Sequence, residues 1–141
     1  MGPLAIDRLP DDGLVLVDSA PIIYVLDGSG PRSSRFAPLF EAQDAGRLRL
    51  AISTVTIAEV LTGPLQAGDE TLARRYRSVL ETWQVVALTA DIAESAARIR
   101  ASLRLKLPDA VQVASALAIN ADALVTHDRD FSRVSGLLVL S

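Results

Sequence analysis

Four carboxylates in this sequence are spaced so that one fold could bring them together, and they are Asp18, Glu59, Asp109 and Asp128. Asp18 directly follows the apolar run 14–17, and Asp128 lies two residues beyond the run 123–126. The other two lie near the starts of predicted helices. If the runs are parallel strands, all four belong to one edge of a sheet, because strand ends and the following helix starts meet there.

Such a cluster cannot remain charged without compensation. Six pairs of unit charges at ~7 Å, with an effective dielectric constant of about 20, repel by roughly 14 kcal/mol in total. That equals the stability of a whole domain, which is about 5–15 kcal/mol. The carboxylates must therefore be protonated, paired with arginine or bound to a divalent cation. Oxygen ligands suit Mg²⁺ or Mn²⁺, and metal at such an edge is typical of phosphodiester hydrolysis.

Each carboxylate also has a purely structural interpretation. Asp18 could cap the helix that follows it, and Asp109 is favoured in a first turn by the helix dipole. Glu59 could lie on a solvated helix edge, and Asp128 could simply occupy a turn. Asp130 competes with Asp128 for the fourth position, although we favour Asp128 and interpret Asp130 as a local cap. These alternatives remain open from the residues alone.

Apolar runs that alternate with helical patterns predict an α/β fold. Strands are predicted at 14–17, 48–52, 85–88, 123–126 and 137–140. Helices are predicted from a Ser19 cap to Gly28, from a Ser33 or Ser34 cap to Ala45, from a Ser53 or Thr54 cap to Gly63-Pro64, over 70–83, over 90–103 behind Thr89, and over 108–121. Helical crossovers require a parallel sheet, here of four to five strands with helices on both faces.

Length and composition bound the function classes. The chain has 141 residues, which is the size of one domain, and we expect residues 1–12 to be a flexible lead to a domain at 13–141. It has no cysteine and one histidine, so disulfides, thiolate zinc sites and histidine metal cages are excluded. We interpret the histidine, His127, as a loop residue rather than a general base. With no export signal and no spanning segment, we expect a soluble, cytoplasmic protein.

The charge balance limits how the chain could meet nucleic acid. The formal net charge is −3, which argues against broad non-specific binding. Arginines could still provide a local path to an acidic site. The candidates are Arg32, Arg35, Arg74, Arg75 and Arg77, although most could belong to a solvated surface.

Four segments together resemble the PIN-domain ribonucleases of the VapC type, the toxins of bacterial VapBC toxin–antitoxin pairs. These segments are VLVDSAPIIYVLDG, ISTVTIAEVLTG, LPDAVQVASALA and ALVTHDRDF, in the order of the family. The resemblance implies a single PIN-like domain in which Asp18, Glu59, Asp109 and Asp128 are catalytic and hold one or two Mg²⁺ or Mn²⁺ ions. Ser19 and Thr126 would support the site with hydroxyl groups, and Asp130 would lie beside it.

The resemblance also implies what the protein does. It would be a metal-dependent endoribonuclease and toxin that inhibits translation and growth, a homodimer silenced by a VapB-type antitoxin. A metal-activated water, oriented by Glu59 or Asp109, would attack the scissile phosphate and leave a 5′-phosphate. Two alternatives remain, namely a housekeeping RNA-processing nuclease without a toxin role, and a PIN fold that only binds.

Overall fold

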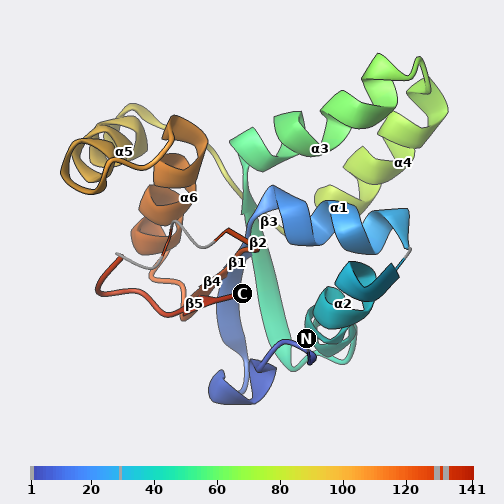
Figure 1. Cartoon of the computed structure of the whole chain (residues 1–141), viewed down its shortest axis with the longest axis horizontal. Coiled ribbons are helices and arrows are strands. Elements are labelled where there is room, and N and C mark those ends of the chain that lie inside the picture. The colour runs from blue at the N-terminus through green and yellow to red at the C-terminus, as the bar shows by residue number, and fades with distance from the viewer. Residues whose placement is uncertain (1, 29, 129–130, 132–133) are drawn as a thin grey trace.

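A computed structural model describes residues 2–28, 30–128, 131 and 134–141. Its strands are β1 (Gly13–Val17), β2 (Leu48–Ser53), β3 (Gln84–Val86), β4 (Ala123–Val125) and β5 (Val139–Leu140). Its helices are α1 (Ser19–Asp27), α2 (Gly30–Asp44), α3 (Thr54–Gln66), α4 (Glu70–Leu80), α5 (Ala90–Leu103) and α6 (Leu107–Ala118), with a 3-10 turn at Ile6–Arg8. Figure 1 shows the sheet between two groups of helices, as the α/β pattern predicts.

The five strands form one parallel sheet in the order β3-β2-β1-β4-β5, which places β1 at its centre. The last pairs align the carboxyl ends, with Val17 opposite Val125 and Ser53 opposite Val86. Residues that follow β1, β2 and β4 therefore emerge at the same edge of the sheet. That edge faces the space between α3 and α6 (Figure 1).

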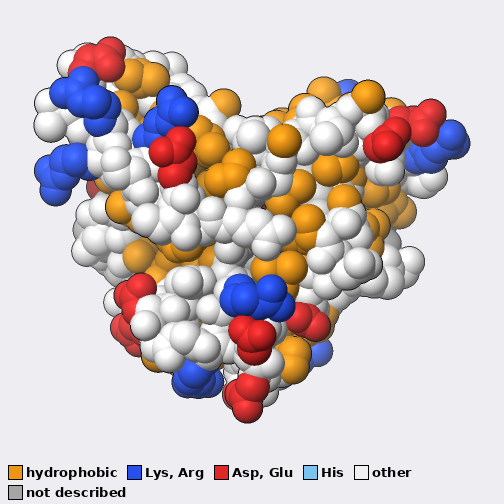
Figure 2. Space-filling view, turned by 180° about the vertical axis from the view of Figure 1, so that it is seen from behind, with side chains coloured by type: hydrophobic (Ala, Val, Ile, Leu, Met, Phe, Trp, Pro, Cys, Tyr) orange, Lys and Arg blue, Asp and Glu red, His pale blue; other side chains and the backbone are white. Residues whose placement is uncertain are grey.

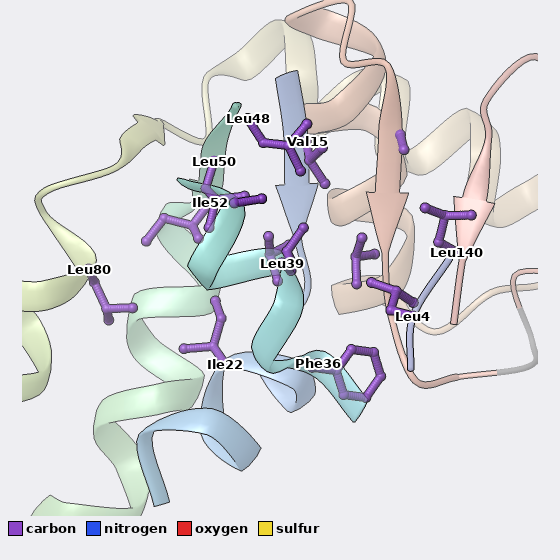
Figure 3. Close-up of a cluster of buried hydrophobic side chains, with 14 of the residues drawn as sticks. Leu4, Val15, Ile22, Phe36, Leu39, Leu48, Leu50, Ile52, Leu80 and Leu140 are labelled. Atoms are coloured by element: carbon purple, nitrogen blue, oxygen red, sulfur yellow. The ribbon is translucent and has the colours of Figure 1, made fainter. Parts of the chain in front are cut away.

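The sheet separates two apolar cores, and β1 contributes to both. Val15 and Val17 lie in the core against α1 to α4, where Phe36 is among the largest fully buried side chains (Figure 3). Leu14 and Leu16 lie in the core under α5 and α6. A strand covered on both faces needs apolar side chains at every position, which is why this run does not alternate with polar residues.

The predicted helix caps hold in part. Thr89 caps α5, its hydroxyl accepting from the Ile92 amide at 3.2 Å, and α5 has the predicted bounds. Ser53 rather than Thr54 caps α3. The Ser19 cap predicted for α1 is wrong, because Asp18 is the N-cap and Ser19 is the first helical residue, whereas the predicted end at Gly28 is confirmed.

Other boundaries also differ from prediction. Helix α4 ends at Leu80 rather than 83, α6 ends at Ala118 rather than 121, and β5 contains only Val139–Leu140 of the predicted 137–140. Helix α2 begins at Gly30 rather than after Ser33 or Ser34, and Pro31 next to it suits a first turn. Helix α3 continues through Pro64 to Gln66, because a proline so near a helix end removes only one late hydrogen bond. Strand β3 stops at Val86, since its partner β2 ends at Ser53 and offers no further pairing.

The predicted lead, residues 1–12, contributes one residue to the core. Leu4 is buried, and its amide donates to the Arg35 carbonyl at 3.1 Å. The flexibility expected of the lead stays a prediction. Within the described residues, no helix has both the length and the apolar character needed to cross a membrane.

Candidate active site

Asp18 lies at the carboxyl end of β1 and accepts hydrogen bonds at both carboxylate oxygens. Oδ1 accepts from the Ser19 amide at 2.8 Å and from the Gln112 Nε2 at 3.2 Å, and Oδ2 accepts from the Thr126 hydroxyl at 2.9 Å. The side chain is only 8% exposed, and this burial raises the pKa of Asp18 despite the three donors. The capping interpretation is therefore correct, but Asp18 also forms a centre that joins three elements.

Two buried polar residues that sequence reasoning missed hold this centre together. Gln112 on α6 donates from the same Nε2 to the Thr56 hydroxyl at 2.7 Å, and both residues are fully buried. Thr56 in turn lies 3.3 Å from the Ser53 hydroxyl at the end of β2. A signal was present, because Gln112 interrupts an otherwise apolar helical run three residues after Asp109.

Glu59 on α3 is half-buried beside this centre. Burial raises the pKa of Glu59, the charge of Asp18 raises it further, and a hydrogen bond with the Ser19 side chain opposes both. The Ser19 side chain, predicted to support the site, therefore forms a hydrogen bond with Glu59, while the Ser19 amide donates to Asp18.

Asp109 lies in the first turn of α6. Burial raises the pKa of Asp109 to about 6, and the charges of Asp18, Asp128 and Glu59 add to this effect, while Lys106 opposes it. Its Oδ2 atom is buried and has no hydrogen-bond partner among the described residues. A buried carboxylate oxygen without a donor is costly, so this atom is suited to a ligand that supplies positive charge.

Thr126 fixes the segment that carries the fourth carboxylate. Its hydroxyl donates to Asp18 and accepts from the Asp128 amide at 3.0 Å. The predicted supporting role of Thr126 therefore has a geometric basis. Asp130 lies outside the described residues, so the competition between Asp128 and Asp130 stays open.

His127 is held by aromatic neighbours. Its Nδ1 lies 2.9 Å from the Tyr24 hydroxyl, and its ring meets those of Tyr24 and Phe36 edge-on, with ring centroids 5.4 and 5.8 Å apart. This placement accounts for His127 as a structural residue of the loop after β4.

The four carboxylates thus share one edge, where each affects the ionisation of others. The described residues contain no group of three or more acidic or histidine side chains close enough to hold a metal ion together. In charge and donor type the residues fit a divalent cation, because the ligands are all oxygen and Asp109 has a buried oxygen to offer. Binding one ion would require these carboxylates to turn toward one another.

Several arginines proposed for RNA have structural partners. Arg35 donates to the Gly2 and Ser141 carbonyl oxygens, and Arg77 pairs with Glu81 at 2.9 Å. Arg32 lies over the Tyr24 ring, 5.2 Å from its centroid. Figure 2 shows that Lys and Arg side chains over the arm formed by α3 and α4 are mixed with acidic ones.

The sequence matches the model of the PIN domain family over residues 15–137. The chain belongs to the PIN domain family. The match includes all four carboxylates, and the parallel sheet flanked by helices is the expected α/β PIN fold. No curated protein sequence matches this PIN domain.

Solved structures similar to this PIN domain include toxin–antitoxin complexes and a toxin. A toxin–antitoxin complex from Klebsiella pneumoniae is 28% identical, with a TM-score of 0.70 over 88% of this chain and 95% of the other. VapBC2 from Rickettsia felis, bound to a DNA fragment from its promoter, is 18% identical with a TM-score of 0.71 over 89% and 96%. The sarcin-ricin loop cleaving toxin VapC20 from Mycobacterium tuberculosis is 20% identical with a TM-score of 0.70 over 88% and 96%. The VapC resemblance seen in the sequence is confirmed at the level of the fold.

Proposed function

We propose that this PIN domain is a metal-dependent endoribonuclease that cleaves RNA phosphodiester bonds as the toxin of a toxin–antitoxin pair. The observation that carries the proposal is the half-buried Asp109 beside three further carboxylates, with a buried oxygen that has no donor in the part of the chain that the structure describes. A buried carboxylate with a purely structural role would be paired with a cation or satisfied by hydrogen bonds. The likeness to a toxin that cleaves an RNA loop supports RNA as the substrate.

Asp18, Glu59, Asp109 and Asp128 would hold Mg²⁺ or Mn²⁺. The bound cation would neutralise charge on the phosphate and lower the pKa of a water molecule. Asp18 is the least free to move, since three donors fix its oxygens. We therefore assign it the role of anchor and leave adjustment of the site to the other carboxylates.

Glu59 and Asp109 are the candidates for orienting the attacking water. Both are half-buried carboxylates at this edge, where an oxygen can accept a hydrogen bond from a water molecule. Water oxygen would bond to phosphorus as the bond to the 3′ oxygen breaks, which leaves a 5′-phosphate and a 3′-hydroxyl. The 2′-hydroxyl takes no part in this scheme, so RNA with a 2′-deoxy residue at the scissile position should still be cut.

The proposal includes partners. Similar solved structures contain toxin–antitoxin complexes, which supports a VapB-type antitoxin as the inhibitor of this chain. We further propose a homodimer, a cytoplasmic location and, as the consequence of cleavage, inhibition of translation and growth. A housekeeping nuclease would have the same chemistry, and growth arrest upon expression, relieved by an antitoxin, distinguishes the toxin from it.

The deciding experiment is cleavage of total cellular RNA by the purified protein with Mg²⁺, with Mn²⁺ and with chelator. Asp109→Asn is the test variant, and Asp91→Asn is its control, because Asp91 lies in the first turn of α5 as Asp109 lies in that of α6. We expect discrete fragments that require metal, and a loss of about 10²–10⁴-fold in rate for Asp109→Asn. The control should cleave like the wild type.

Other outcomes would contradict the proposal in different ways. Intact RNA under all conditions, with no effect of metal on the melting temperature, would assign a binding role to this PIN fold. Intact RNA with a clear metal-dependent rise in melting temperature would support the metal site and overturn the substrate. Cleavage that continues in chelator would overturn the metal requirement.

A further inference from the structure

A groove where α5 connects to α6 carries positive charge that has no part in the chemistry proposed above. It has a volume of about 640 Å³ and is lined by Arg100, Arg104 and Lys106. Leu105, Leu107 and two alanines of α5 supply the apolar part of its lining. The two helices pack against each other on one side of the sheet (Figure 1).

The local backbone explains why three cations share this groove. Arg100 lies in the last turn of α5, and Arg104 directly follows the last helical residue, Leu103. Arg104 adopts a left-handed conformation with φ of 58°, which ends α5, and its amide donates to the Arg100 carbonyl at 2.8 Å. The chain then turns back, and Lys106 becomes the residue that precedes α6.

Within the described residues, the cations of the groove form no ion pair. Among the described residues, the ion pairs join Arg49 to Asp12, Arg77 to Glu81 and Arg98 to Glu94, and none includes a cation of the groove. All three groove side chains are exposed. In a chain whose net charge is −3, three cations in one groove form a local site for an anion.

The groove adjoins the start of α6, whose first turn carries Asp109. Lys106 lies three residues before Asp109 on the same turn of chain, and its charge is felt there, since it lowers the pKa that burial raises. Lys106 therefore belongs to both the groove and the surroundings of the catalytic carboxylate. A polyanion bound by Arg100 and Arg104 would be brought by Lys106 to the acidic edge of the sheet.

We propose that Arg100, Arg104 and Lys106 bind backbone phosphates of the RNA substrate in the α5–α6 groove and guide the strand to Asp109. This inference rests on the proposed ribonuclease function and names where its substrate binds. Arginine and lysine recognise phosphates without regard to base, while the apolar lining accommodates riboses or bases. The arginines of α4 and Arg35, which the sequence suggested, are then not the principal RNA contacts.

The test separates binding from cleavage. Anisotropy of a fluorescein-labelled single-stranded RNA, measured in chelator over a series of KCl concentrations, reports binding alone. The triple variant Arg100→Gln, Arg104→Gln, Lys106→Gln is compared with the matched triple variant Arg47→Gln, Arg74→Gln, Arg75→Gln. The second set also removes three exposed cations, so the two variants have the same net charge and differ only in location.

We expect the groove variant to bind RNA about 100-fold more weakly at roughly 0.1 M salt, with a salt dependence reduced by about two phosphate contacts. The matched variant should lose much less. Equal losses in the two variants, or an unchanged affinity in the groove variant with a normal melting temperature, would overturn the proposal. Lys106→Gln alone should raise KM in the cleavage assay more than it lowers kcat.

Failure of the groove and failure of the nuclease are distinguishable. Wild-type cleavage that persists unchanged in the groove variant would refute the groove and leave the nuclease intact. RNA binding lost in the groove variant, with no cleavage by any protein, would support the groove and refute the nuclease. Unchanged RNA binding with loss of binding to a polyglutamate peptide would assign the groove to an acidic protein partner and overturn our proposal.

Discussion

Asp18 and Asp109 lie at the same edge of the sheet but differ in how their charge is accommodated. Asp18 is nearly fully buried, and both of its oxygens accept hydrogen bonds. Asp109 is half-buried, and its Oδ2 has no donor among the described residues. The inner carboxylate is therefore held by the surrounding structure, while the outer one has an oxygen without a donor there, which fits our proposal that it binds a cation. A single cluster of acids thus combines a fixed anchor with an unsatisfied group.

The same substitution should have opposite effects on stability at the two positions, and the larger effect belongs to Asp18. In Asp18→Asn an amide nitrogen replaces one oxygen and faces a donor, either the Thr126 hydroxyl or the Gln112 amide. An unsatisfied buried pair of this kind costs about 1–3 kcal/mol, which lowers the melting temperature by several degrees. Thermal unfolding in chelator measures the change. A variant as stable as the wild type would show that the network contributes little.

Gln112→Leu examines the same network from its other end. Leucine keeps most of the side-chain volume but removes the donor shared by Asp18 and Thr56. We expect a loss of about 1–3 kcal/mol in the free energy of unfolding, because two buried acceptors lose a donor. Gln112→Glu is the companion variant, and it should be worse, since it places a further carboxylate beside Asp18. If Gln112→Glu were the more stable variant, the direction of this hydrogen bond would be wrong.

Asp109→Asn should stabilise the protein in the absence of metal, and the effect should depend on pH. The pKa of Asp109 is about 6 in the folded chain and 3.8 ordinarily, so the folded protein binds more protons between these values. The contribution of this group to stability is present below about pH 4 and is lost as pH rises through 6. The asparagine variant lacks this loss.

The melting temperatures of the wild type and Asp109→Asn, in chelator, should therefore diverge as pH rises from 4 toward 7. We expect the variant to be higher by a few degrees at neutral pH. Asp91→Asn, with its exposed carboxylate, is the control and should show no such divergence. A lower melting temperature for Asp109→Asn at pH 7 would contradict the assignment of unrelieved repulsion to this site.

Added Mg²⁺ should reverse the order of the two proteins. It should raise the melting temperature of the wild type by binding among the four carboxylates, and it should raise that of Asp109→Asn less. Ca²⁺ and Na⁺ at matched ionic strength separate binding from screening. Equal shifts for the two proteins would show that Asp109 is not a ligand.

The sequence predicted those features of the fold and the site that depend on local residue patterns. The apolar run 14–17 predicted a strand buried on both faces, and Thr89 predicted the start of α5. It also placed Asp18 and Asp128 at the same edge of the sheet, because parallel topology follows from helical crossovers. It did not predict that Asp18 would be satisfied by hydrogen bonds while Asp109 would not.

That difference depends on contacts between distant residues. Gln112 lies 94 positions from Asp18 and 56 from Thr56, and no local rule relates them. The groove cations were missed for a similar reason, since Arg104 and Lys106 flank a helix end whose left-handed turn the pattern did not reveal. The sequence predicted that α3 ends at Pro64, because proline disfavours a helix interior. The helix continues to Gln66, since one lost hydrogen bond near a helix end is tolerated.

The smallest effect should come from the outermost support of the edge. Tyr24 on α1 holds His127 by a hydrogen bond of 2.9 Å, and His127 directly precedes Asp128. Tyr24→Phe keeps the ring contacts with His127 and Phe36 and removes only the hydroxyl. We expect a loss of about 0.5–1.5 kcal/mol in stability, and a modest weakening of Mg²⁺ binding measured by calorimetry.

Tyr76→Phe removes a hydroxyl from α4 and serves as the control. Weakened Mg²⁺ binding in Tyr24→Phe alone would show that the loop after β4 must be held in place for Asp128 to act, whereas equal Mg²⁺ binding in both variants would confine the role of Tyr24 to packing.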